Sequence, residues 1–357
     1  MLLAQPNRRD ERKHDVAAHA LRQLSRGSAG VAPNIRLLAW LLRSASWRIP
    51  RILVYHRFGE GSRFISPKGF ERQLRFLKDH CNVIHLSRLV ASLCGLQPMP
   101  QNAVVLTVDD GYADFYRLAY PLLCQYELPC TFFVTTTFVG GSRWLWPDRL
   151  AWMLQQREQF PSLNVANQVV TGGTKAAAPR LWAEILDLLQ KLTFEEVEGA
   201  LRGLQEQLEV EVPERPVAGY QACTWDQLRE MENSGLVEVG GHTRNHVILS
   251  RLDPRELLSE INGCFDDLSS RLGSRPRSFC YPNGKPADFS DAVREAVVKA
   301  GFASACTAFY DDKHLNDRYA LRRFSSSEDF AQFYKAASGL QYWGARFLGR
   351  NNIAVTE

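Results

Sequence analysis

Two adjacent carboxylates are the first residues of this chain whose types and spacing suit chemistry. Asp109 and Asp110 follow the continuous apolar run AVVLTV (residues 103–108) and precede Gly111. Two carboxylates at the end of a buried strand are costly unless a cation or a proton offsets their charge. A divalent ion bound to one, with the other free as a base, would offset it. The plain structural alternative is an Asx-type turn in which Gly111 supplies the unusual backbone angle.

A pair of histidines offers the remaining ligands for such an ion. His242 and His246 have the i, i+4 spacing that aims two imidazoles at one point from a single helical turn. The alternative is two exposed or capped histidines that follow a loop. Together with one carboxylate they would form a facial ligand set with open positions, which suits zinc, or else cobalt, nickel or manganese. The ion would polarise a carbonyl and the free carboxylate would take a proton from water, which is the chemistry of amide hydrolysis.

Repeated strand and helix patterns must position these side chains. Apolar, β-rich segments alternate with helical patterns from residue 51 onward, at 51–56, 103–108, 131–135, 236–239, 277–281, 302–306 and 319–324. Repeated βα units imply a parallel sheet, and seven or eight strands suggest a barrel. The chemistry of such barrels lies at the carboxyl ends of the strands, where Asp109, His242 and Asn283 fall in this reading.

Three segments resemble the motifs of the polysaccharide deacetylase superfamily, also called NodB-homology or carbohydrate esterase family 4. TVDDG at 107–111 is similar to its T-F-D-D-G motif, HTRNH at 242–246 to its H-[ST]-x-x-H motif, and FCYPNG at 279–284 to its third motif. The resemblance covers residues 51–330 and implies a distorted (β/α)7 TIM-like barrel. It also implies roles for four side chains and one backbone group. Asp109 would be the base, Asp110, His242 and His246 the metal ligands, and the backbone N–H of Asn283 the oxyanion donor.

Two departures from the family pattern leave questions open. Cys280 stands where many members carry an arginine that orients the base, and its substitute could be Arg277, Arg322 or Arg323. The late motif that supplies a general acid is not evident. His56, at the end of the first strand, is our candidate acid, and His314 is a weaker one. The alternative for His56 is a satisfied histidine at a strand end.

Large aromatic residues could line a sugar-binding groove by stacking on pyranose faces. The candidates are Trp144, Trp146, Trp225 and Tyr281. The alternative is packing in the core or in a cap, because large aromatic side chains are mostly buried.

The chain divides into four parts. A basic arm (1–50) precedes a catalytic domain (51–345), which carries a helical insertion at about 141–222, and a tail follows at 346–357. A long segment at the end of a strand is typical of a substrate-side cap. Residues 35–51 mix Leu and Trp with four arginines. They predict either an amphipathic helix on an anionic membrane surface or one that packs on the protein body.

Composition limits the class of protein further. The net charge of +4 over 357 residues is too small to indicate nucleic-acid binding, and no obligate protein partner is evident. The eight cysteines form no C-x-x-C pair, which favours buried, reduced thiols. No apolar leader or membrane span is evident. We therefore expect a cytoplasmic protein, in peripheral contact with the inner face of the membrane.

These observations predict a metal-dependent hydrolase that removes an N-acyl group, expected to be acetyl, from an amino sugar. The substrate would be a polysaccharide, an oligosaccharide or a lipid-linked glycan precursor. Two alternatives stay open. One is deformylation, or hydrolysis of a non-sugar amide, at the same site. The other is a catalytically silent barrel that binds a glycan or a partner.

Overall fold

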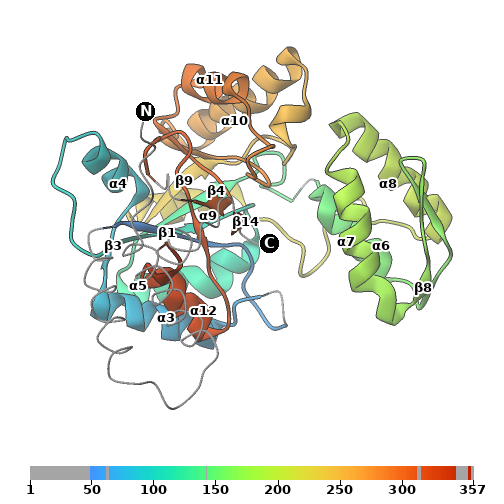
Figure 1. The fold of residues 1–357 in the computed structure, drawn as a ribbon, viewed down its shortest axis with the longest axis horizontal. Coiled ribbons are helices and arrows are strands. Elements are labelled where there is room, and N and C mark those ends of the chain that lie inside the picture. The colour runs from blue at the N-terminus through green and yellow to red at the C-terminus, as the bar shows by residue number, and fades with distance from the viewer. Residues whose placement is uncertain (1–48, 62–63, 142, 312–314, 343–352, 355–357) are drawn as a thin grey trace, which may run out of the picture.

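The computed structural model describes residues 49–61, 64–141, 143–311, 315–342 and 353–354 (Figure 1). Most of the predicted arm, nearly all of segment 35–51, His314 and most of the predicted tail lie outside these ranges. Among the described helices, none has the length and apolar character needed to cross a membrane.

A parallel sheet forms the centre of the molecule, in the order β11-β10-β9-β4-β3-β1-β13, and β2 pairs with the start of β3 (Figure 1). The strands are β1 (Arg51–Tyr55), β2 (Asn82–Val83), β3 (Ala103–Val108), β4 (Cys130–Val134), β9 (Val237–Gly241), β10 (Ser278–Cys280), β11 (Ser304–Cys306) and β13 (Phe324–Ser325). A short antiparallel pair joins β12 (Phe309–Tyr310) to β14 (Ile353–Ala354).

The segment before β13 joins the two ends of this sheet. Leu321 donates its N–H to Ala305 at 2.9 Å and accepts one from Thr307 at 2.9 Å, which attaches it to β11. Three residues later, Phe324 lies in register with Leu53 of β1. The sheet is therefore curled into a distorted barrel, and the predicted (β/α)7 TIM-like fold is confirmed.

Strand alternation explains why the apolar runs are continuous. Along β3, Val105 belongs to a cluster inside the barrel, whereas Leu106 and Val108 belong to the cluster beneath the outer helices. Both faces of β3 are therefore buried, which removes the polar half of the usual two-residue period. The inner cluster also contains Ile52, Phe133, Cys280, Cys306 and Leu321.

Three helices of the barrel begin directly after a residue whose side chain caps them. Ser66 caps α3 (Pro67–His80), Thr224 caps α9 (Trp225–Asn233) and Asp253 caps α10 (Pro254–Leu272), each through its side-chain oxygen. The others are α4 (Leu86–Leu93), α5 (Tyr120–Tyr126), α11 (Asp291–Ala300) and α12 (Phe330–Ala337). A π-helical turn, Phe115–Ala119, leads into α5.

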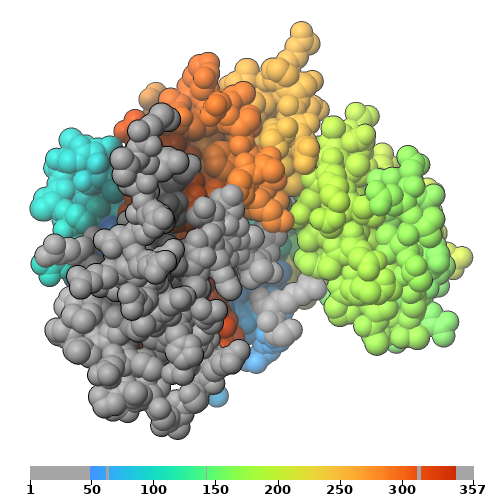
Figure 2. Space-filling view, in the orientation of Figure 1, coloured from blue at the N-terminus to red at the C-terminus, as the bar shows by residue number. Residues whose placement is uncertain are grey.

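The chain between β4 and α9 forms a separate lobe beside the barrel (Figures 1 and 2). Its helices α6 (Trp146–Gln155), α7 (Ala178–Leu189) and α8 (Phe194–Leu208) enclose a core of their own. Two antiparallel pairs were not predicted, β5 (Gln159–Phe160) with β8 (Gly173–Thr174) and β6 (Leu163–Val165) with β7 (Gln168–Val170). Strands of two or three residues are too short for an alternation of apolar and polar residues to be recognised in the sequence.

Gly240→Ala is expected to destabilise the barrel next to the site. An added Cβ would lie 2.6 Å from the Phe133 ring and 2.8 Å from the carbonyl oxygen of Ser278. Such overpacking costs roughly 1–3 kcal/mol. Gly203→Ala in α8 is the control, because nothing lies within 4 Å of its added Cβ, and alanine favours a helix by about 1 kcal/mol over glycine. Urea unfolding measures both, and an unchanged midpoint for Gly240→Ala would contradict the packing described.

Candidate metal centre and active site

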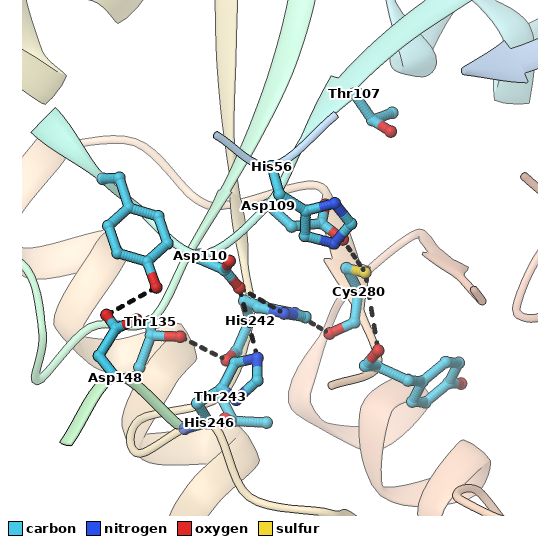
Figure 3. A network of polar contacts seen from close by, with 12 residues as sticks. His56, Thr107, Asp109, Asp110, Thr135, Asp148, His242, Thr243, His246 and Cys280 are labelled. Atoms are coloured by element: carbon cyan, nitrogen blue, oxygen red, sulfur yellow. Dashed lines mark hydrogen bonds and ion pairs between the residues drawn. The ribbon is translucent and has the colours of Figure 1, made fainter. Parts of the chain in front are cut away.

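Three side chains from two strand ends converge at the top of the barrel (Figure 3). Asp110 follows β3, and His242 and His246 follow β9. Their ligand atoms lie within 4.8 Å of one another. The Oδ1 atom of Asp110 is 3.5 Å from Nε2 of His242 and 3.3 Å from Nε2 of His246. Burial alone would raise the pKa of Asp110, but its contacts with the two imidazoles hold that pKa well below the usual value.

A tight turn orients the two carboxylates differently. The N–H of Gly111 donates to the carbonyl of Asp109 at 3.1 Å, and Asp110 between them has a φ of 80°. This is the hydrogen-bond pattern of a γ-turn, which is strained for a residue with a side chain. A similar turn follows β10, where Gly284 donates to the carbonyl of Pro282 across Asn283 with its φ of 57°. Strain of this kind concentrates at functional sites.

The two histidines do not share a helical turn, so that part of the prediction was wrong. Residues 242–246 form a loop in which Thr243 and His246 have φ values of 63° and 55°. The hydroxyl of Thr243 accepts the N–H of His246 at 2.9 Å. Glu260 of α10 accepts the N–H groups of Arg244 and Asn245, each at 3.0 Å. The loop brings the two imidazole centroids to 4.9 Å, and its support by Glu260 was not foreseen.

Arg323 is the arginine that orients Asp109. It lies immediately before β13, and its two terminal nitrogens each donate to one oxygen of Asp109 at 2.7 Å. Both side chains are buried. Burial alone would raise the pKa of Asp109, but the guanidinium brings it below the usual value. Arg322 instead pairs with Asp311. The structure therefore distinguishes the two adjacent arginines that the sequence left as alternative partners of Asp109.

Cys280 lies beside the same carboxylate and replaces the family arginine without copying its role. Its thiol is 3.5 Å from Oδ2 of Asp109, and Arg323 approaches its sulfur at 3.0 Å. Asp109, His242 and Cys280 form a second cluster with metal-ligand spacing. Arg323 already engages both oxygens of Asp109 and approaches the sulfur of Cys280, so a cation lies where this second cluster would hold its ion. The cluster centred on Asp110 therefore fits a metal ion better.

His56 lies on the other side of Asp109. It follows β1, and its Nε2 is 3.8 Å from Oδ2 of Asp109. Its side chain is 22% exposed and borders the same pocket as Asp110 and His246. This position gives it access both to the base and to a bound molecule.

Two residues of the third motif, Asn283 and Tyr281, lie in different surroundings. The side chain of Asn283 donates to Asp288 at 2.7 Å, and no acceptor for its backbone N–H exists among the described residues. Tyr281 is buried, stacks on Phe289 and donates its hydroxyl to the carbonyl of Tyr319 at 3.0 Å. Tyr281 therefore packs in the core and does not line the pocket.

A pocket of 530 Å³ opens between the barrel and the insertion, and Asp110, His246 and His56 lie in its wall. The three candidate tryptophans lie elsewhere. Trp144 and Trp146 donate their indole N–H groups to Pro213 and His246, and Trp225 borders a different cavity. The aromatic rings of this pocket are those of Phe64, Tyr112, Trp182 and Tyr220. Sequence periodicity could not find them, because they come from four separated segments.

The fold and the site define a TIM-like barrel with an Asp-His-His cluster at the carboxyl ends of its strands. The family model for polysaccharide deacetylases matches residues 97–162 and 172–305. The chain therefore belongs to the polysaccharide deacetylase family. His56 and Arg323 lie outside the matched residues.

One curated protein and two solved structures are similar to this chain. YxkH of Bacillus subtilis carries the name of a polysaccharide deacetylase and is 30% identical to this chain over 139 residues. The match covers 38% of this chain and 49% of YxkH. The structure of IcaB from Ammonifex degensii has a TM-score of 0.54 at 21% identity, covering 81% of this chain and 96% of that one. The Streptococcus pyogenes deacetylase PplD in complex with acetate gives a TM-score of 0.53 at 18% identity, with coverages of 82% and 96%. At these identities the structures show a shared fold.

The donor set fits a first-row divalent ion. One carboxylate and two imidazoles converge, and Nδ1 of His242 lies 2.8 Å from the carbonyl of Cys280. If this nitrogen carries the proton, Nε2 is left as the ligand atom. Three protein ligands leave positions open for other molecules.

His242→Ala is expected to abolish metal binding, because it removes one of three ligands. Elemental analysis of the purified protein should find about one divalent ion per wild-type chain and almost none in the variant. His80→Ala, an exposed histidine on α3, is the control and should keep its ion. Chelation should lower the melting temperature of wild type and of His80→Ala but not that of His242→Ala, since an ion at a hundred times its Kd stabilises by about 2.7 kcal/mol. A wild type without metal after incubation with zinc would contradict the assignment.

Proposed function

We propose that this protein is a metal-dependent amide hydrolase that removes an N-acyl group, expected to be acetyl, from an amino sugar. The observation that carries the proposal is a buried carboxylate, Asp109, held by Arg323 beside the Asp110, His242 and His246 cluster. A base next to a metal cluster, at the wall of a pocket, is the arrangement that amide hydrolysis needs.

Each group would have one task. Asp110, His242 and His246 would hold a divalent ion, expected to be zinc, which when bound polarises the amide carbonyl and lowers the pKa of water. Asp109 would take the proton of the attacking water. Because Arg323 holds both carboxylate oxygens and keeps the pKa of Asp109 low, the base is ionised and fixed in orientation.

Two further groups would complete the reaction. The backbone N–H of Asn283 would stabilise the oxyanion, which agrees with its lack of an acceptor among the described residues. His56 would donate a proton to the leaving amine, since it borders the pocket beside Asp109.

The substrate would be an amino-sugar polysaccharide, an oligosaccharide or a lipid-linked precursor. Its sugar ring would occupy the pocket between barrel and insertion, where aromatic rings can stack on its apolar faces. We also propose that the insertion at 141–222 acts as a cap. The related reaction, deformylation of an amino sugar, would use the same groups, and separate assays of acetate and formate release distinguish the two.

Asp109→Asn is expected to lose turnover but keep the metal, because the amide cannot accept the water proton whereas the three ligands are untouched. Loss of a general base lowers kcat by about 10²–10⁴-fold. Acetate release from the N-acetylglucosamine trimer and elemental analysis measure the two properties. A variant as active as wild type would exclude Asp109 as the base. Absence of acetate and formate release by wild type from all N-acylated amino sugars tested would overturn the proposed function.

Arg323→Lys is expected to lower kcat by about 10²-fold, because an ammonium cannot hold both oxygens of Asp109 and small displacements of a catalytic group are costly. KM and metal content should change little. Arg322→Lys is the matched control, since Arg322 is the adjacent buried arginine and pairs bidentately with Asp311, at 3.0 Å through each nitrogen. Equal losses in both variants would indicate a general effect on folding instead of an effect on the base.

A further inference from the structure

One acidic residue of the insertion reaches the catalytic pocket. Asp148 lies in the first turn of α6, is 8% exposed, and borders the pocket together with Asp110 and His246. Charged side chains are seldom buried without a partner or a ligand. Neither the metal cluster nor the proposed reaction uses this carboxyl group.

Its position is fixed from both sides. The hydroxyl of Tyr112, two residues after Asp110, donates to Oδ2 of Asp148 at 2.8 Å (Figure 3). Two residues before Asp148, the indole N–H of Trp146 donates to the carbonyl of His246 at 3.0 Å. The start of α6 is therefore tied to the segments that carry two of the three metal-cluster residues.

The other oxygen of Asp148, Oδ1, belongs to a side chain in the pocket wall. Within the described part of the chain, Oδ1 has no hydrogen-bond partner. The nearby cation Arg57 is engaged elsewhere, since its Nε pairs with Asp114 at 2.7 Å and its guanidinium stacks 3.7 Å from the centroid of the Tyr112 ring.

The rest of the insertion wall offers few polar contacts. It consists largely of apolar groups, including Leu154, Ala178, Pro179 and Trp182. Such a wall can cover the apolar face of a sugar ring, and besides Asp148 its side-chain acceptors are few, chiefly Gln155 and Tyr220. A hydroxyl group that is buried without an acceptor loses the hydrogen bond it made to water, and a carboxyl oxygen at this position would replace that bond.

We propose that Asp148 binds a hydroxyl group of the amino sugar next to the scissile amide and so determines which sugars the pocket accepts. The inference rests on the proposed function, because it takes the sugar to lie between the metal cluster and the insertion. Tyr112 is the positioning residue that directs Oδ1 of Asp148 into the pocket.

The test compares Asp148→Ala, Asp148→Asn and Tyr112→Phe with wild type on the N-acetylglucosamine trimer. We expect Asp148→Ala to raise KM about tenfold while kcat changes less than threefold. Asp148→Asn, which retains a carbonyl oxygen, should recover part of the loss, and Tyr112→Phe should show an intermediate KM. Asp187→Ala is the control, since Asp187 is an exposed acidic residue of the insertion that pairs with Lys191.

A second readout does not depend on turnover. In the Asp109→Asn background, calorimetry should show that Asp148→Ala weakens binding of the trimer about tenfold without loss of metal. Unchanged KM and binding in Asp148→Ala, with wild type still releasing acetate, would overturn the inference and leave the proposed function standing. Loss of metal from Asp148→Ala would also overturn it, because Asp148 would then support the metal cluster. No release and no binding by any protein would overturn both.

Discussion

The ion pair between Arg323 and Asp109 is the interaction on which the site depends. It places two opposite charges inside a barrel of apolar side chains, where neither would be stable alone. It also joins the end of β3 to the segment that closes the sheet, because Arg323 lies between Leu321, which bonds β11, and β13, which bonds β1. The segment that closes the barrel therefore also orients the carboxylate of Asp109.

The positions of the insertion and of the loop of residues 242–246 also depend on each other. The insertion has its own core, yet its first helix contacts this loop through Trp146 and the end of β3 through Asp148 and Tyr112. A lobe that merely covered the site would not need these contacts. Their presence means that a shift of α6 would move groups beside the metal cluster.

The site also concentrates backbone strain. Asp110, Thr243, His246 and Asn283 all have positive φ values, and each follows a strand of the barrel. Such conformations cost about 1–3 kcal/mol each and persist only where the surroundings impose them. Here Glu260, the Thr243 hydroxyl and the closed barrel supply that constraint. The cost is consistent with a scaffold that holds ligands and base in one arrangement before a substrate enters.

The sequence alone was sufficient for features that depend on near neighbours. Capping residues such as Ser66 and Asp253 determined where helices begin, and the buried runs determined the strands and hence the barrel. The motif residues 109–110, 242 and 246 predicted a candidate site, because each motif is a short run of neighbouring residues. Tertiary structure decided what depends on distant segments meeting. It decided that Arg323 and not Arg322 faces Asp109, that a loop and not a helical turn unites the histidines, and that Asp148 enters the pocket. The contacts of Asp148 with Tyr112 and of Arg323 with Asp109 join residues 36 and 214 positions apart, and no local pattern encodes which of them come together.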